Sequence, residues 1–168
     1  YDVATGDEEL SVAGGAWGWG GGLALTHDGT RLIATGWDGA NALIDTVTGD
    51  IVVDYDDHGK RRFRHPLVLS DDSAFVATPS DPPAAELWSL TSNEMVRTYT
   101  GVTGQMFALA LSKSGGRMAA GGTSNTVTSW NAVTGAAFCT YTGHTGWIWS
   151  IDYSDDQRLA ASGSVDNL

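Results

Sequence analysis

This sequence of 168 residues contains little cysteine, little proline and few basic side chains. Its single cysteine, Cys139, excludes an intrachain disulfide framework and favours a reducing, intracellular location, with the cytoplasm expected. Only 9 Lys and Arg residues stand against 20 Asp and Glu residues, and the net charge is −11. Such a surface repels a phosphate backbone, so direct binding of nucleic acid is not expected. No apolar run approaches the roughly 18 residues that cross a bilayer, so membrane insertion is not expected either.

Residues with catalytic chemistry are present, but they do not follow catalytic or metal-binding patterns. The four histidines lack metal-ligand spacing and there is no Cys-x-x-Cys pair, so neither a metal nor another cofactor is expected. The glycine-rich string GGAWGWGGG lacks the Lys-Ser/Thr ending of a phosphate-binding loop. The Asp pairs at 71–72 and 155–156 lie in polar turns, where Asp is favoured because it caps its own backbone. These patterns predict a protein that is not an enzyme.

Glycine and apolar residues are abundant. The chain has 22 glycines and is 42% hydrophobic, which is typical of a globular, turn-rich protein. Short segments such as GLALT, RLIATGW and PLVLS are rich in β-branched and apolar residues, and no stretch shows apolar residues at helical spacing over a dozen positions. We therefore expect an all-β fold that forms one domain over residues 1–168.

Two sequence markers recur at nearly constant spacing. The first is a hydroxyl residue in a polar turn, whose four copies are 44, 42 and 42 residues apart: Thr26, Ser70, Ser112 and Ser154. The second is a six-residue string with a hydroxyl residue at its fifth position, followed by Gly or Asn: YDVATG, IDTVTG, WSLTSN and WNAVTG. Gly and Asn tolerate the positive φ of a tight turn. The period predicts four repeats, at approximately 1–45, 46–89, 90–131 and 132–168.

These repeats resemble the WD40 repeat of β-propeller proteins. The likeness is clearest in residues 143–167, GHTGWIWSIDYSDDQRLAASGSVDN, which contain a Gly-His pair, an apolar strand, a Ser-Asp-Asp turn and a Ser-Gly-Ser-x-Asp segment. The resemblance implies a β-propeller of about four blades, each a four-stranded antiparallel sheet, with the last blade incomplete.

The same resemblance implies a structural hydrogen-bond set of His, Ser or Thr, Asp and Trp in each blade. The last repeat offers His144, Ser162 and Asp166. The members expected in the other repeats are Thr35 and Asp38 in the first, Thr78 and Trp88 in the second, and Trp130 in the third. The third repeat has Val102 and Gly121 at the His and Ser positions. Because a complete polar set rigidifies a blade, partial sets should leave these blades more dependent on their neighbours.

An incomplete last blade predicts an open sheet edge. Unpaired backbone groups on such an edge invite pairing with another strand, so further blades or a second chain are expected there. Three arrangements remain open. In the first, the chain is part of a longer propeller. In the second, it pairs with a second copy in a ring of about eight blades, and in the third it closes alone as a four-bladed ring.

Aromatic residues are predicted around the mouth of the propeller channel, which is the usual docking surface in this family. Counting back seven residues from each turn hydroxyl gives four equivalent rim positions: Trp19, Phe63, Gln105 and Trp147. Trp17 and Trp37 are assigned to the same surface. Large aromatic side chains are typical anchors of protein interfaces. Packing between blades is the alternative role for each of them.

A basic string, HGKRRFRH, stands out in this acidic sequence. It contains four of the nine basic residues: Lys60, Arg61, Arg62 and Arg64. Arginine clusters bind acidic or phosphate-bearing partners, so we expect this loop to contribute to partner binding. Alternatively, its charges balance the nearby Asp54, Asp56 and Asp57.

The sequence thus predicts a non-catalytic protein–protein interaction scaffold, a subunit or segment within a larger multi-protein assembly. The alternative is a propeller enzyme or small-ligand binder that uses the channel mouth. That alternative requires polar or charged side chains that converge on the channel. Because one fold hosts many functions, both hypotheses depend on analogy as far as the sequence goes.

Overall fold

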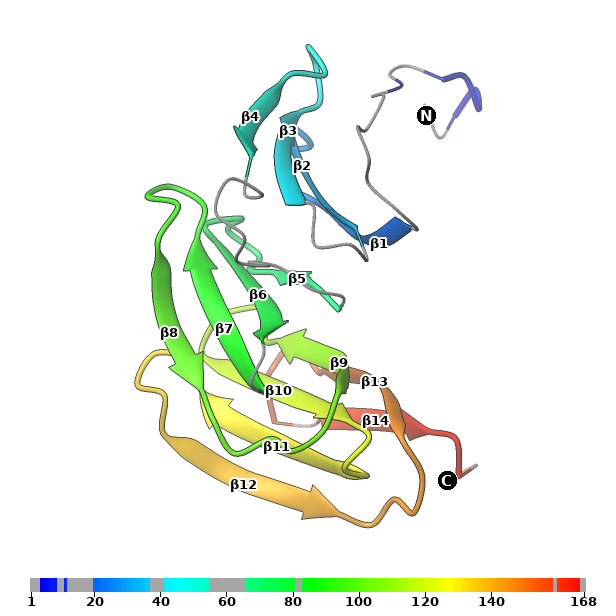
Figure 1. The fold of residues 1–168 in the computed structure, drawn as a ribbon, viewed down its shortest axis with the longest axis vertical. Coiled ribbons are helices and arrows are strands. Elements are labelled where there is room, and N and C mark those ends of the chain that lie inside the picture. Colours follow the sequence, from blue (N-terminus) through cyan, green and yellow to red (C-terminus); the bar gives the residue numbers. More distant parts are fainter. Residues whose placement is uncertain are drawn as a thin grey trace. The chain divides into compact units, whose positions relative to one another are not determined.

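The computed structural model describes residues 4–8, 11, 20–36, 41–54, 66–80, 83–158 and 160–166. Fourteen β-strands occur in these residues, arranged in four antiparallel sheets (Figure 1). The described ranges contain no helix, and hence none long and apolar enough to cross a membrane. The predicted all-β fold of about four sheet-like blades is confirmed. The chain divides into two compact units, residues 1–64 and 65–168.

The N-terminal unit contains one sheet, which we call blade 1. Its strands follow one another in the order of the chain: β1 (Gly20–Leu25), β2 (Arg31–Gly36), β3 (Asn41–Asp45) and β4 (Ile51–Asp54). Ala34, Ala42 and Ile44 form its buried apolar cluster, with Leu32 packed against them.

The C-terminal unit contains the other three sheets. Blade 2 consists of β5 (Val68–Leu69), β6 (Phe75–Ser80), β7 (Ala84–Ser89) and β8 (Met95–Tyr99). Blade 3 consists of β9 (Met106–Leu111), β10 (Arg117–Gly122), β11 (Thr126–Asn131) and β12 (Ala137–Thr142). Blade 4 has two strands among the described residues, β13 (Ile148–Tyr153) and β14 (Ala160–Ser164).

In blades 1, 2 and 4, the turn between the first and second strands is closed by the predicted hydroxyl residue and an Asp two positions later, whereas in blade 3 the Ser112 hydroxyl accepts from the Arg117 backbone N–H without an Asp. In blade 1, the Thr26 hydroxyl donates to Asp28 at 2.7 Å, and Asp28 also accepts from the Thr30 backbone N–H at 3.0 Å. Ser70 and Asp72 make the same bond in blade 2, as do Ser154 and Asp156 in blade 4. The hydrogen bond from Thr26 is the main cause that lowers the pKa of Asp28 to about 2. These carboxylates are therefore capping groups.

The turn between the third and fourth strands follows the second sequence marker. Asp45 accepts hydrogen bonds from the backbone N–H groups of residues 47 and 48, and Asn131 accepts from residues 133 and 134 in the same way. The Gly or Asn of each string has positive φ, which is 77° at Gly49, 57° at Asn93 and 79° at Gly135. The conformation is the one for which Gly and Asn are favoured.

Blades 2 and 3 pack face to face through the main core of the C-terminal unit. Its largest buried side chains are Tyr99 and Trp130, whose ring centroids are 5.9 Å apart. The Trp130 indole donates to the Thr100 carbonyl at 3.0 Å, and the Tyr99 hydroxyl donates to the Ala132 carbonyl. The polar atoms of both rings are thus satisfied, as buried Trp and Tyr require.

A second apolar cluster joins blade 3 to blade 4. Ala108, Ala119, Val127 and Ile148 are buried in it, and Ile151 and Tyr153 pack against it. Burial raises the pKa of Tyr153 to about 12. Gly121 allows the two sheets to approach, because a Cβ atom there would lie 2.9 Å from the Ile148 Cγ2 atom. Consecutive sheets of this unit are therefore stacked on one another, as in adjacent propeller blades.

Candidate functional site: an exposed aromatic cluster

The first strands of blades 3 and 4 each carry a β-bulge at the same position. In β9 the pairing with β10 shifts between Met106 and Ala108, which leaves Phe107 unpaired. In β13 the pairing with β14 shifts between Ile148 and Ser150, which leaves Trp149 unpaired. A bulge bends the strand and redirects the side chain of the extra residue. Phe107 and Trp149 are 42 residues apart, so they occupy equivalent places in consecutive repeats.

The two redirected rings stack on each other and are joined by a third. The ring centroids of Phe107 and Trp149 are 4.7 Å apart, and the ring planes differ by 9°. Trp147 is tilted against both, at 5.8 Å from Phe107 and 6.5 Å from Trp149. We call these three residues the aromatic cluster. It includes one of the rim residues predicted from the sequence, Trp147.

The cluster is open to solvent. Trp147 is 48% exposed and Trp149 is 52% exposed, whereas Phe107 is half-buried beneath them. Each aromatic contact contributes about 0.5–1.5 kcal/mol beyond the area that it buries, so the rings hold one another in place before any partner arrives. A partner would remove further aromatic surface from water and freeze few side-chain rotations, which is the property of interface hot spots.

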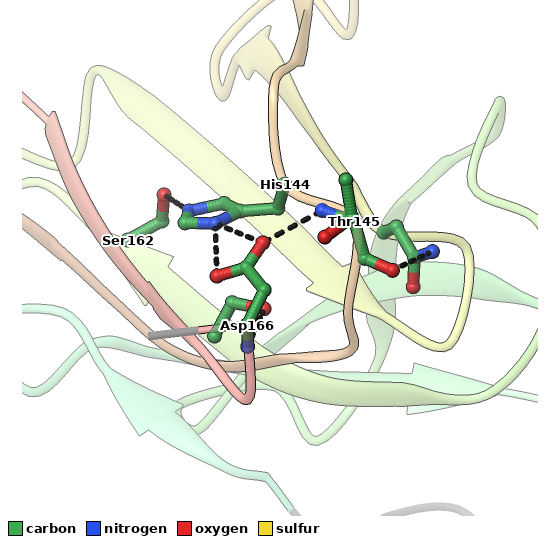
Figure 2. Close-up of polar contacts among 6 residues, drawn as sticks. His144, Thr145, Ser162 and Asp166 are labelled. Carbon is green, nitrogen blue, oxygen red and sulfur yellow. Dashed lines mark hydrogen bonds and ion pairs between the residues drawn. The ribbon is translucent and has the colours of Figure 1, made fainter. Parts of the chain in front are cut away.

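The loop that leads to Trp147 is fixed by a polar set in blade 4 (Figure 2). The His144 Nδ1 atom lies 3.1 Å from both carboxylate oxygens of Asp166, and its Nε2 atom lies 2.9 Å from the Ser162 hydroxyl. With the proton on Nδ1, the ring donates to Asp166 and accepts from Ser162. Asp166 also accepts from the Thr145 backbone N–H at 2.6 Å. The structure thus joins the three side chains expected in this repeat and anchors the loop before β13.

Blade 3 has an apolar version of the same arrangement. Val102 and Ala120 lie in the same buried cluster as Trp130. Neither side chain has a polar atom, so the absence of the His–Ser pair from blade 3 leaves no side-chain donor or acceptor unsatisfied at these two positions. Replacing both partners of a buried hydrogen bond with apolar groups therefore costs little stability. The indole of Trp130 instead donates to Thr100, as described above. In blade 2, Thr78 is fully buried, and the Trp88 indole donates to Glu86 at 3.1 Å.

The sequence alignment of the first and third repeats is wrong by one residue. Ser162 pairs with Ile151, three residues before its turn hydroxyl, and the residue paired at that position in blade 1 is Ala34. Thr35 is therefore not the counterpart of Ser162. Its hydroxyl instead bonds to the backbone of Gly22, accepting from N at 2.7 Å and donating to O at 3.2 Å. In blade 3 the counterpart is Ala120 rather than the expected Gly121.

Gln105 and Trp147 occupy equivalent positions in blades 3 and 4. Both are exposed and directly precede the first strand of their blade. The Gln105 carbonyl accepts from the Thr123 backbone N–H at 2.9 Å, and the Trp147 carbonyl accepts from Val165 at 3.2 Å. Gln105 places no aromatic ring on the surface. The remaining predicted site residues lie outside the described residues: Trp17, Trp19, Trp37, Asp38, Lys60, Arg61, Arg62, Phe63 and Arg64.

Sequence reasoning missed Phe107 and Trp149, although both are aromatic at a spacing of 42 residues. That shared spacing was the available signal. Strand alternation alone could not show which side of the sheet they occupy, because the bulge changes the alternation at these residues. Within the described ranges, no group of three or more His, Cys, Asp or Glu side chains could hold a metal ion.

Comparison with known proteins supports the resemblance inferred from the repeats. Residues 135–168 match the family model of the WD domain, G-beta repeat. A search of curated proteins gave no match. The matched segment contains the His144 set together with Trp147 and Trp149, and the antiparallel sheets of the described residues are consistent with a segment of such a propeller. Repeats of this family generally mediate protein–protein interactions.

Proposed function

We propose that this chain of WD40-type repeats is a non-catalytic interaction scaffold within a larger multi-protein assembly, and that it binds a partner protein through the aromatic cluster. The single observation that carries the proposal is the exposed stack of Phe107 and Trp149 with Trp147 beside it. The match of residues 135–168 to a family of interaction repeats supports it.

The construction of the cluster supports a binding role rather than a role in the core. Rings that served only to join blades 3 and 4 would be buried between them, as Val127 and Ile148 are. Trp147 and Trp149 are instead about half exposed. Two bulges and the His144 set fix their positions, and rigid, preorganised side chains lose less entropy when a partner binds.

Replacing both tryptophans of the cluster with alanine tests the proposal. We expect Trp147→Ala/Trp149→Ala to weaken partner binding by about 2 kcal/mol or more, which is the effect of losing a hot spot. The measurement is quantitative mass spectrometry of proteins captured from an extract of the cells that make the chain. Phe138→Ala is the matched control, because Phe138 is also 48% exposed but lies on β12, outside the cluster.

The control decides between a specific site and general stickiness. Proteins that are lost with the double variant and kept with Phe138→Ala are the partners of the cluster. Circular dichroism of both variants checks that the sheets are retained. Equal capture by the folded double variant and the unchanged chain would reject the aromatic cluster as the binding surface.

A further inference from the structure

A groove lies between blades 2 and 3 at one edge of their contact. It is at the end of β9 that is opposite to the aromatic cluster. Phe107 is near the start of β9, whereas the groove begins at Leu111, the last residue of that strand. The groove has a volume of about 500 Å³, within the range of sites that hold ligands or side chains of a partner. It therefore lies on a different surface from the one proposed above.

The groove exists because one turn residue has no side chain. Gly115, Ser73 and Gln157 occupy the same place in the turns of blades 3, 2 and 4, with φ of 69°, 54° and 58°. Between blades 3 and 4, the Gln157 side chain bridges the preceding turn, reaching the Ser112 hydroxyl at 3.3 Å and the Ser114 hydroxyl at 2.5 Å.

Between blades 2 and 3 the bridging position is Gly115. A Cβ atom at Gly115 would meet nothing within 4 Å. Gln157 thus closes the junction between blades 3 and 4, whereas the equivalent junction between blades 2 and 3 is open. The open junction between blades 2 and 3 therefore exposes apolar surface of the kind that is covered in the junction between blades 3 and 4.

The walls of the groove are apolar and carry two cations. Phe75, Leu87, Val96, Leu111 and Val133 supply the apolar surface. Val96 and Val133 are exposed at its edge, at 47% and 69%. Surface of this kind accommodates a bulky aliphatic or aromatic side chain.

The cations are Arg97 and Lys113. The Arg97 Nη1 atom donates to the Thr134 carbonyl at 3.2 Å, and its Nε atom is buried without a hydrogen-bond partner in the described part of the chain. A guanidinium has five N–H donors, so Arg97 retains capacity for a carboxylate. Lys113 is 3.8 Å from Asp155 and 58% exposed, a weak pairing that leaves most of its charge available.

Two carboxylates also line the groove, and they limit what it can accept. Asp72 is committed to its own turn, where it accepts from the Ser70 hydroxyl and from the Ala74 backbone N–H. Asp71 is exposed and would repel a second negative charge. Two carboxylates thus balance the two cations, so the groove accepts at most one acidic group, which Arg97 is placed to bind, beside an apolar one.

We infer that this groove is a second docking site, for a short segment of a partner protein in which one Asp or Glu is adjacent to a bulky apolar residue. The acidic side chain pairs with Arg97 and Lys113, and the apolar side chain enters the space left by Gly115. The inference is independent of the aromatic cluster and of the partner bound there.

Gly115→Gln tests the inference, because it should fill the groove as Gln157 fills the next junction. The equivalent residues Ser73 and Gln157 show that side chains are accepted at this φ. The probe is an array of fluorescein-labelled heptapeptides with one Glu beside Leu or Phe, together with Lys-for-Glu and Ala-for-Leu versions. We expect the Glu-Leu and Glu-Phe peptides to bind, and Gly115→Gln to reduce their affinity about tenfold or more.

Lys113→Glu is a second variant that leaves the volume of the groove unchanged. We expect it to weaken the Glu peptides and to favour the Lys-for-Glu versions, because it reverses one wall charge. Trp147→Ala/Trp149→Ala is the control, because both residues lie outside the groove lining, and it should leave peptide binding unchanged. No preference for the acidic-apolar peptides, or a preference that survives in folded Gly115→Gln, would overturn the inference.

Discussion

Single Asp side chains close the turn between the first and second strands in blades 1, 2 and 4. Asp28, Asp72 and Asp156 accept a hydrogen bond from a hydroxyl two residues earlier in three different blades. These bonds favour the charged form of each carboxyl group, and the pKa of all three is lowered. A group whose pKa is lower in the folded state stabilises the fold above its unfolded pKa, and this contribution is lost as the pH falls.

The hydroxyl at Thr26 should control the titration of Asp28. The folded pKa of Asp28 is about 2, against an ordinary value of 3.8, so its stabilising effect is present above about pH 4 and lost as the pH falls towards 2. We expect Thr26→Val to raise the Asp28 pKa towards 3.8, as measured by NMR titration of the side-chain carboxyl. Ser154→Ala should raise the pKa of Asp156 and leave Asp28 as it was. An Asp28 titration that is the same in Thr26→Val would refute this cause.

At the scale of strands and loops, the His144 set determines how firmly the loop before β13 is held. Ser162→Ala removes the hydroxyl that meets the His144 ring at 2.9 Å. We expect it to lower the free energy of unfolding by about 1 kcal/mol, the net value of one hydrogen bond. Ser162→Thr should restore most of this loss, because Thr78 follows the turn hydroxyl of blade 2 at the same spacing as Ser162 follows that of blade 4. Urea unfolding followed by tryptophan fluorescence gives the comparison, and equal stability of Ser162→Ala and the unchanged chain would contradict it.

Elements were more predictable from the sequence than their exact register. The turn hydroxyls and the Gly or Asn strings predicted the strands and turns, since both signals are local. The equivalence of Gln105 and Trp147 followed from counting along one strand, and their location at a channel mouth stays a prediction. The misplacement of Thr35 and the absence of Phe107 and Trp149 from the predicted site have another cause. The pairing between strands determines which residues are equivalent and which face of the sheet they occupy. A bulge shifts that pairing without a distinct residue pattern.

At the scale of the whole molecule, the excess of acidic residues sets the response to salt. The net charge of −11 places like charges over a small protein, and their repulsion opposes the compact state. The capping carboxylates keep their negative charge to a lower pH than an ordinary Asp, because their pKa is lowered.

Added salt should therefore stabilise the fold. We expect the melting temperature at pH 7 to rise by several degrees between about 0.02 and 0.3 M NaCl, as the Debye length shortens to below 10 Å. Thermal unfolding followed by circular dichroism measures it. Sodium sulfate is unsuitable for this comparison because it also strengthens apolar burial. A melting temperature that falls with NaCl would show that attractive ion pairs outweigh the repulsion.

The left-handed turn position shared by Gly29, Ser73, Gly115 and Gln157 has an evolutionary consequence. Its backbone conformation is the same whether the residue has no side chain, a hydroxymethyl group or a long amide. After duplication of an ancestral repeat, one substitution at this position could open or seal a crevice between neighbouring copies without altering any strand. A repeat protein could in this way gain a binding crevice at one junction while the sequence signals for its strands and turns stayed the same in every repeat.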